Sequence, residues 1–358
     1  MTLNLQSINV LIVDDSLVAR ELLIYILNSD PEINILGIAE NGEKALAFIK
    51  KHKPDVITMD VHMPGLNGYE TTQKIMGTQP VPIVTVSTAV DEQSVDDSFR
   101  SMEAGALAIV EKPRGIDDPA HRQMADHLIK TVKLMSEVKV VRRRMYPTRT
   151  KPPLRFPDNR KLYGRRSDIK IVAMGVSTGG PPVVQTILSL LPSNFEAPVL
   201  IVQHIAAGFL HGMADWLRKE SALPVHIAAH KDSLMSGHVY LAPDNYHMGV
   251  TRGSILLSKK KPGDCICPSV SHLFRSVSEV FKENAAGVIL TGMGRDGAEE
   301  LLLIKNYKGV TIAQNKESCV VFGMPEAAVS LGAVQYVLPP DKIAQKLIQL
   351  VRGHHGNI

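Results

Sequence analysis

The sequence predicts an α/β protein made of two doubly wound domains, each with a parallel sheet that helices cover on both faces. Three observations predict this class. The 358 residues exceed one ordinary domain, and 44% of them are hydrophobic. Continuous apolar runs alternate with helical stretches in both halves of the chain. A basic, proline-containing stretch separates the halves, so we expect domains over 1–138 and 168–352, a linker over 139–167 and a polar tail over 353–358.

The N-terminal half has a βα repeat with five strands. Its apolar runs lie at 8–15, 33–40, 54–60, 81–87 and 106–113, and helical patterns between them include 17–28, 42–52 and 67–76. Because these runs are hydrophobic throughout, they predict a parallel sheet that is buried on both faces. Right-handed crossovers then bring the carboxyl ends of all five strands to one edge.

Polar residues end four of these strands. Asp14 and Asp15 close the first, Asp60 the third, Ser87 the fourth and Lys112 the fifth. Three converging carboxylates repel one another unless a hard cation is bound, and Mg²⁺ prefers such all-oxygen ligands. Asp60 would then attack a phosphoryl group to form an acyl phosphate, while Lys112 and Ser87 hold its oxygens. The alternative, solvated strand ends, fits any one of these residues but fits five in register poorly.

The stretch between the halves is strongly basic. Residues 139–166 hold eleven Lys or Arg and one acidic residue, Asp158, whereas the formal net charge of the whole chain is +4. Several prolines and the lack of apolar periodicity predict a linker. A DNA-binding regulator would also have basic segments, but no helix-turn-helix pattern occurs here, so we expect no nucleic-acid partner.

The C-terminal half repeats the doubly wound pattern. Strands are predicted at 169–175, 197–204, 285–292, 309–314 and 334–339, and helices near 181–191, 270–284, 296–306 and 340–352. Residues 236–258 alternate with a period of two and carry turn residues, which predicts a small antiparallel insertion.

The first strand of this half runs into a Gly-Val-Ser-Thr-Gly-Gly turn at 175–180. The turn could present Ser177 as a nucleophile, hold a phosphate, or simply end a buried strand. No phosphate-binding glycine pattern is present, and Pro181 and Pro182 remove two N–H donors from the helix start. Gly175 to Gly179 match the G-x-S-x-G elbow of α/β hydrolases, but only a polar tail supplies a histidine after the candidate acid, Asp296.

Another order of residues makes a serine hydrolase possible. Ser177, His204 and Asp296 each lie at the carboxyl end of a predicted strand, so they could meet in one cleft. His204 would take the proton of Ser177, and Asp296 would orient the imidazole. The glycine-rich turn 291–297 would supply an oxyanion donor, with the N–H of Met293 as the candidate. Three unrelated strand-end residues remain the alternative at this point.

The segments "VDDS", "DVHMPGLNG" and "VEKP" resemble the receiver domain of two-component response regulators, which has a flavodoxin-like fold. The resemblance implies that Asp60 is the phosphoacceptor and that Asp14 and Asp15 bind Mg²⁺ together with it. It also implies that Ser87 is the switch hydroxyl and that Lys112 contacts the phosphoryl group.

The segments "GVSTGGP", "VQHI", "YLAPDNYHM", "LTGMGRDG" and "SCVVFGMPEAAV" resemble the Rossmann-like catalytic domain of the chemotaxis receptor methylesterase (CheB) family. The resemblance implies a triad of Ser177, His204 and Asp296, supported by Thr178 and Met293. It implies hydrolysis of glutamate methyl esters on methyl-accepting chemotaxis receptors, often with deamidation of receptor glutamines, and no cofactor for the esterase. One departure concerns substrate contacts: Ser271 stands where the family usually has an aspartate.

The resemblance also implies partners and control. The receptors would be substrates, a chemotaxis histidine kinase would be the phosphodonor, and the receiver would block the active site until Asp60 is phosphorylated. No leader or membrane segment is evident, so we expect a cytoplasmic monomer with three reduced cysteines, which does not insert into the membrane. A non-enzymatic scaffold and a hydrolase for a different ester or amide remain open alternatives.

Overall fold

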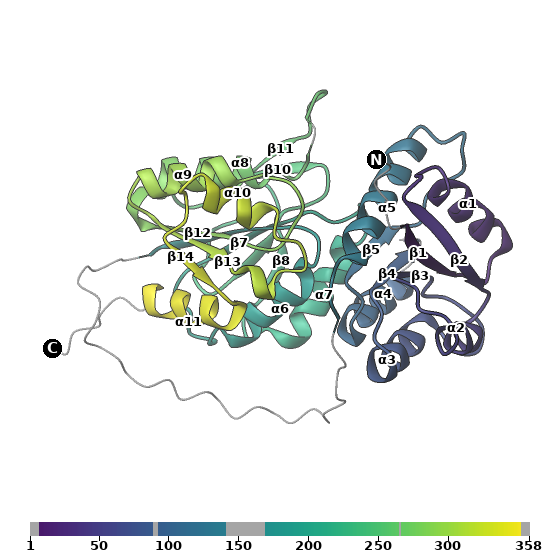
Figure 1. The fold of residues 1–358 in the computed structure, drawn as a ribbon. Coiled ribbons are helices and arrows are strands. Elements are labelled where there is room, and N and C mark those ends of the chain that lie inside the picture. The colour runs from purple at the N-terminus through teal and green to yellow at the C-terminus, as the bar shows by residue number, and fades with distance from the viewer. Residues whose placement is uncertain (1–6, 89–91, 141–168, 265, 352–358) are drawn as a thin grey trace, which may run out of the picture.

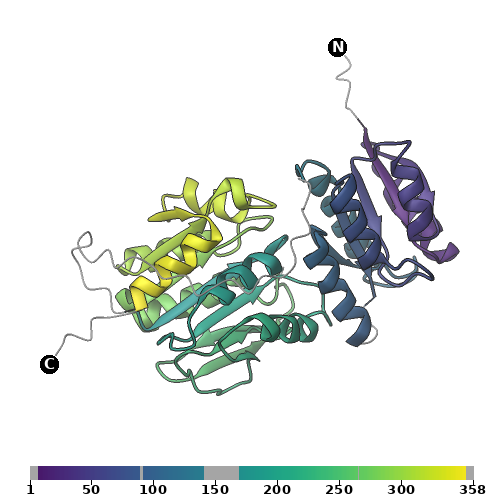
Figure 2. The same cartoon turned by 90° about the horizontal axis from the view of Figure 1, so that it is seen from below.

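The computed structural model describes residues 7–88, 92–140, 169–264 and 266–351. They form two α/β units, each built on its own sheet (Figures 1 and 2). The predicted tail 353–358, and the predicted linker apart from its first two residues, lie outside the described residues. No helix within the described ranges has the length and apolar character that crossing a membrane requires.

The N-terminal unit has a five-stranded parallel sheet with the order β2-β1-β3-β4-β5. Its strands are β1 (Ile8–Val13), β2 (Ile33–Ala39), β3 (Val56–Met59), β4 (Ile83–Ser87) and β5 (Ala108–Glu111), and its helices are α1 (Leu17–Leu27), α2 (Gly42–Ile49), α3 (Gly68–Thr78), α4 (Glu92–Ala104) and α5 (His121–Ser136). Apolar residues of α1 and α5 pack on one face of the sheet, and those of α2 and α3 pack on the other.

The register of this sheet explains why its polar residues gather. Val13 at the end of β1 lies beside Met59 at the end of β3, so Asp14 and Asp60 follow directly from paired positions. On the other side, Ser87 of β4 pairs with Glu111 of β5, the residue before Lys112.

The C-terminal unit has a seven-stranded parallel sheet with the order β14-β13-β12-β6-β7-β9-β8. Its strands are β6 (Ile171–Val176), β7 (Val199–Gln203), β8 (Val225–Ile227), β9 (Val239–Leu241), β12 (Ala285–Ile289), β13 (Val310–Gln314) and β14 (Tyr336–Leu338). Within the predicted antiparallel insertion, β9 instead joins this sheet and pairs parallel to β7 and β8, because all three of its residues are buried. The antiparallel part is the hairpin of β10 (Tyr246–Val250) and β11 (Ile255–Lys259).

Helices cover both faces of the larger sheet. They are α6 (Gly180–Leu190), α7 (Leu210–Glu220) and α11 (Pro340–Val351) on one face, and α8 (Val270–Phe281), α9 (Ala298–Asn306) and α10 (Met324–Ser330) on the other. The hairpin packs with the second group. The fold is therefore the predicted pair of doubly wound domains with a small antiparallel element.

The two units meet where α4 packs against α7 (Figure 1). Val95 and Phe99 of α4 belong to the hydrophobic cluster of the C-terminal unit. The ring of Phe99 stacks on Trp216 of α7 with centroids 5.5 Å apart, and the Trp216 indole N–H donates to the carboxylate of Glu103. Helix α7 follows the loop that begins at His204, so this contact lies close in sequence to a candidate catalytic residue.

Candidate active site and phosphorylation site

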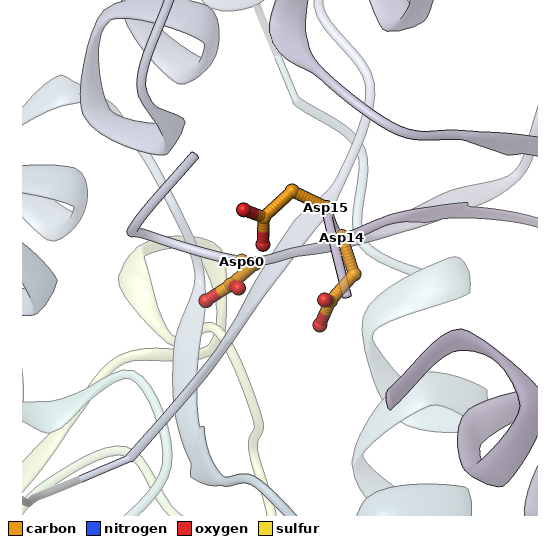
Figure 3. Close-up of side chains that lie close together, drawn as sticks. All are labelled: Asp14, Asp15 and Asp60. Carbon is orange, nitrogen blue, oxygen red and sulfur yellow. The ribbon is translucent and has the colours of Figure 1, made fainter. Parts of the chain in front are cut away.

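The carboxylates of Asp14, Asp15 and Asp60 gather at the carboxyl edge of the smaller sheet (Figure 3). One oxygen from each lies within 4.8 Å of the others. Lys112 Nζ lies 2.7 Å from Asp14 Oδ2 and 2.9 Å from Asp60 Oδ2. Ser87 is buried at the same edge, and its hydroxyl donates to the carbonyl oxygen of Thr88 at 3.4 Å.

Burial and charge oppose each other in this cluster. Burial raises the pKa of Asp60, the charge of Lys112 lowers it and that of Asp14 raises it again, so the pKa lies above its usual value. For Lys112, burial lowers the pKa, but the charges of Asp60 and Asp14 outweigh burial and raise it. The cluster therefore combines three carboxylates with one lysine, which contacts Asp14 and Asp60. This all-oxygen set with excess negative charge fits Mg²⁺.

Sequence reasoning missed the residue that holds this acidic loop. Arg20 of α1 donates from Nη1 to the carbonyl oxygens of Asp14 and Asp15, at 2.7 and 2.8 Å. The guanidinium therefore fixes the backbone from which two of the three carboxylates project. An arginine one and a half turns after the acidic pair was the only signal for this role.

Ser177 follows β6 at the carboxyl edge of the larger sheet, and its backbone is tied down on two sides. Its N–H donates to Thr291 O at 3.0 Å. The buried carboxamide of Gln203 donates to Ser177 O and to His204 O, both at 2.9 Å. One side chain thus connects the backbones of the candidate nucleophile and base, and sequence reasoning did not single it out.

The position of Ser177 also requires glycine opposite it. A Cβ on Gly292 would lie 2.5 Å from Ser177 Cβ and 2.6 Å from Met324 Sδ. Such contacts are far shorter than real carbon contacts, so a side chain at 292 would displace the serine.

His204 and Asp296 lie together. His204 Nε2 is 3.0 Å from Asp296 Oδ2, and their side chains are 18% and 9% exposed. No hydrogen bond joins the Ser177 hydroxyl to His204 within the described residues. The structure thus pairs the predicted base with the predicted acid and ties the predicted nucleophile to the base through the backbone.

The N-terminus of α8 holds Asp296. The carboxylate accepts hydrogen bonds from Val270 N at 2.7 Å, Ser271 N at 3.0 Å and Ser269 Oγ at 3.0 Å. Burial raises the pKa of Asp296, but the contacts with His204 and Ser271 outweigh burial and hold it well below its usual value. Asp296 is therefore an anion that faces the imidazole.

Thr178 and Met293 lie in the two turns that flank Ser177. The Thr178 carbonyl accepts a hydrogen bond from Thr291 Oγ1 at 3.0 Å. Neither backbone N–H, of Thr178 or of Met293, donates to an acceptor in the part of the chain that the structure describes. Both groups can therefore donate to an oxyanion.

Comparisons with known proteins show the family of the chain. The CheB methylesterase family model matches residues 172–347, and the response regulator receiver domain model matches residues 10–124. A protein-glutamate methylesterase/protein-glutamine glutaminase of Nitrosospira multiformis is 51% identical over 347 residues, 96% of this chain and 97% of that protein. The chain belongs to the family of these enzymes. It has their N-terminal receiver domain and C-terminal methylesterase domain, so the predicted family is confirmed.

A second relative agrees with this membership. One such family member, from Syntrophus aciditrophicus, is 50% identical over 96% of this chain and 98% of that protein. The crystal structure of the Thermotoga maritima CheB methylesterase catalytic domain is 41% identical, covers 51% of this chain and 99% of that chain, and has a TM-score of 0.49.

Proposed function

We propose that this chain hydrolyses methyl esters of glutamate residues in methyl-accepting chemotaxis receptors, and carboxamides of receptor glutamines, with Ser177 as nucleophile. The enzyme would act in chemotaxis adaptation, in the cytoplasm. The relatives that match this chain over nearly their whole length are named for both activities. The observation that supports the mechanism most strongly is the 3.0 Å contact between His204 Nε2 and Asp296 Oδ2, in a pair tied through Gln203 to the backbone of Ser177.

The chemistry follows from which imidazole nitrogen faces the acid. Because Asp296 faces Nε2 of His204, Nδ1 is left to take the proton as Ser177 Oγ attacks the ester carbon. Asp296 stabilises the resulting imidazolium. The N–H groups of Thr178 and Met293 would donate to the oxyanion.

The attack of Ser177 gives a tetrahedral intermediate, and its collapse breaks the bond between the former carbonyl carbon and the leaving group. Methoxide takes the proton from His204 and leaves as methanol, and for glutamine the leaving group departs as ammonia. Water then attacks the acyl-enzyme while giving a proton to His204, and Ser177 takes that proton back as glutamate is released.

Phosphorylation of Asp60 would control access to this site. A histidine kinase would supply the phosphoryl group, and Lys112 and Ser87 would contact its oxygens. Mg²⁺ held by Asp14, Asp15 and Asp60 would neutralise the charge of the phosphoryl oxygens.

Docking of the receiver is the means of this control. Helix α4 packs against α6 and α7, which begin shortly after Ser177 and His204. Val320, which lies against the Ser177 turn at Gly179, and Val321 also pack on the core of the receiver. The docked receiver would therefore exclude a bulky receptor helix, and phosphorylation would shift the equilibrium toward release.

The test of the nucleophile is methanol release from methylated receptor membranes. Ser177→Ala should lose nearly all activity. Ser189→Ala, on the exposed side of α6, is the matched control and should keep it. If Ser177→Ala kept more than about a tenth of the wild-type rate, a change of roughly 1.4 kcal/mol in the barrier, the serine mechanism would be refuted.

The test of the phosphoacceptor uses Asp60→Asn, which is nearly isosteric but lacks the carboxylate nucleophile. We expect it to keep basal hydrolysis and to lose stimulation by a small phosphodonor. Stimulation equal to that of the wild type would move the acceptor to another residue.

A further inference from the structure

Ser271 makes two hydrogen bonds to successive residues of the turn that carries Asp296. Its N–H donates to Asp296 Oδ1 at 3.0 Å. Its hydroxyl oxygen accepts the N–H of Gly297 at 2.9 Å. The hydrogen bonds described for Ser269 and Val270 end at Asp296, whereas that of the Ser271 hydroxyl reaches past it to Gly297.

The Gly297 N–H depends on this acceptor. Gly297 is buried, and its φ of 86° places it in the left-handed region at the start of α9. A Cβ there would lie 2.3 Å from Val270 Cγ1, so the turn is packed directly against α8. Without the Ser271 hydroxyl, the buried N–H of Gly297 would lose its hydrogen-bond acceptor. This loss destabilises the present position of the turn.

The Ser271 hydroxyl is neutral, so this side chain adds no charge beside Asp296 and His204. Two arginines on the elements that hold the acid have partners elsewhere: Arg295 is exposed and pairs with Glu299 at 2.7 Å, and Arg275 of α8 pairs with Glu300 at 2.7 Å. Within the described residues, Asp296 is the one carboxylate in contact with the His204 imidazole.

Helix α8 also carries a histidine, His272. His272 stacks on His247, with ring centroids 5.1 Å apart, and burial followed by the charge of His247 lowers the pKa of His272. His272 is therefore held toward its neutral form, and it adds little charge to the field around Asp296.

We propose that Ser271 is a positioning residue, which fixes the Asp296 turn on α8 while adding no second negative charge beside the imidazole. The proposal rests on the proposed function, because it assumes that neutral His204 is the general base. Two separate expectations follow from it, one for the hydrogen bond from Gly297 N–H to Ser271 and one for the lack of charge on the Ser271 side chain.

The charge is tested with Ser271→Asp, which keeps an acceptor for Gly297 but adds an anion next to Asp296. A second negative charge favours the imidazolium form of His204, so more of the base is protonated at a given pH. We expect the acid limb of the kcat/KM profile to move up by about 0.5 to 1 pH unit, with the plateau rate unchanged within about twofold. An acid limb at the wild-type position would overturn the charge part of the proposal.

The hydrogen bond is tested with Ser271→Ala. We expect kcat to fall about tenfold at every pH, with KM and the acid limb unchanged, and Ser271→Thr to restore the rate because it keeps the hydroxyl. Ser278→Ala is the matched control, since that hydroxyl lies on the same helix and donates to Arg275 O, away from the turn. A wild-type kcat in Ser271→Ala, or no rescue by Ser271→Thr, would overturn this part.

Two measurements keep these outcomes interpretable. Thermal unfolding shows whether each full-length variant is folded, and if Ser271→Ala is not, the kcat of Ser271→Thr and the profile of Ser271→Asp decide. Ser177→Ala separates this inference from the proposed function. If that variant is inactive but the Ser271 variants match the wild type, only the role of Ser271 is wrong, whereas an active Ser177→Ala refutes the serine mechanism itself.

Discussion

Gly212→Ala should open the domain interface while it stabilises the helix that carries it. Gly212 lies in α7, where it faces α4 of the receiver. A Cβ at this position would lie 2.2 Å from Cγ1 and 3.2 Å from Cβ of Val95. Valine has one strongly preferred rotamer in a helix, so Val95 cannot turn aside and α4 must move.

The two effects of this methyl group have opposite signs. Overpacking a well-packed contact costs about 1 to 3 kcal/mol, which weakens docking of the receiver by about 5- to 150-fold. Alanine in place of glycine inside a helix stabilises the helix by about 0.5 to 1 kcal/mol. The variant should therefore hydrolyse ester faster without a phosphodonor, up to the activated rate of the wild type, while the methylesterase domain loses no thermal stability.

The assay combines methanol release with fluorescence. Trp216 is the only tryptophan in the chain and is buried against Phe99, so its emission reports on docking. Gly77→Ala is the matched control, because Gly77 lies in α3 and a Cβ there meets nothing within 4 Å. Wild-type basal hydrolysis together with wild-type emission in Gly212→Ala would refute the idea that the contact between α4 and α7 holds the resting enzyme closed.

Two further predictions concern the active site and the interface. Gln203→Leu removes both hydrogen bonds that join the backbones of Ser177 and His204. In steady-state kinetics on a folded variant, kcat should therefore fall at least about tenfold with little change in KM. An unchanged kcat would contradict the role given to this amide. Lys219→Glu reverses the charge of one partner in the 2.9 Å ion pair between Lys219 of α7 and Asp96 of α4. Because surface ion pairs contribute little, basal hydrolysis should rise by at most about fivefold, and adding Asp96→Lys should reverse the rise. A double variant as active as the single one would argue against this pair.

Much of the acidic site could be predicted because its signals are local. A hydrophobic strand that ends in aspartate or lysine is visible in a short window, and parallel sheets bring such ends together. The register that pairs Val13 with Met59 then places Asp14 beside Asp60, as expected. Arg20 was missed because its partners are backbone carbonyls, which leave no pattern in the sequence.

The parts that could not be predicted depend on contacts between distant segments. Strand β9 has only three residues, too few for periodicity to distinguish a parallel partner from an antiparallel one. The buried amide of Gln203 donates to Ser177 O, 26 residues away in the sequence. From the sequence alone, Gln203 is only a polar residue at the end of a strand. Likewise, Phe99 and Trp216 are 117 positions apart, so their stacking could not be predicted. The sequence shows each of them only as an apolar residue of an amphipathic helix.

Helix α4 connects the two sites because it packs into both hydrophobic cores. Met102 of α4 lies in the core of the receiver, whereas Val95 and Phe99 lie in the core of the methylesterase domain. Close-packed interiors do not deform continuously, so a shift of α4 against its own sheet must also disturb its packing on α7. Strand β4, which ends at Ser87, precedes α4, and the loop of His204 precedes α7. A change at the phosphorylation site that displaces α4 would therefore act first on the contact that holds the receiver beside the catalytic residues.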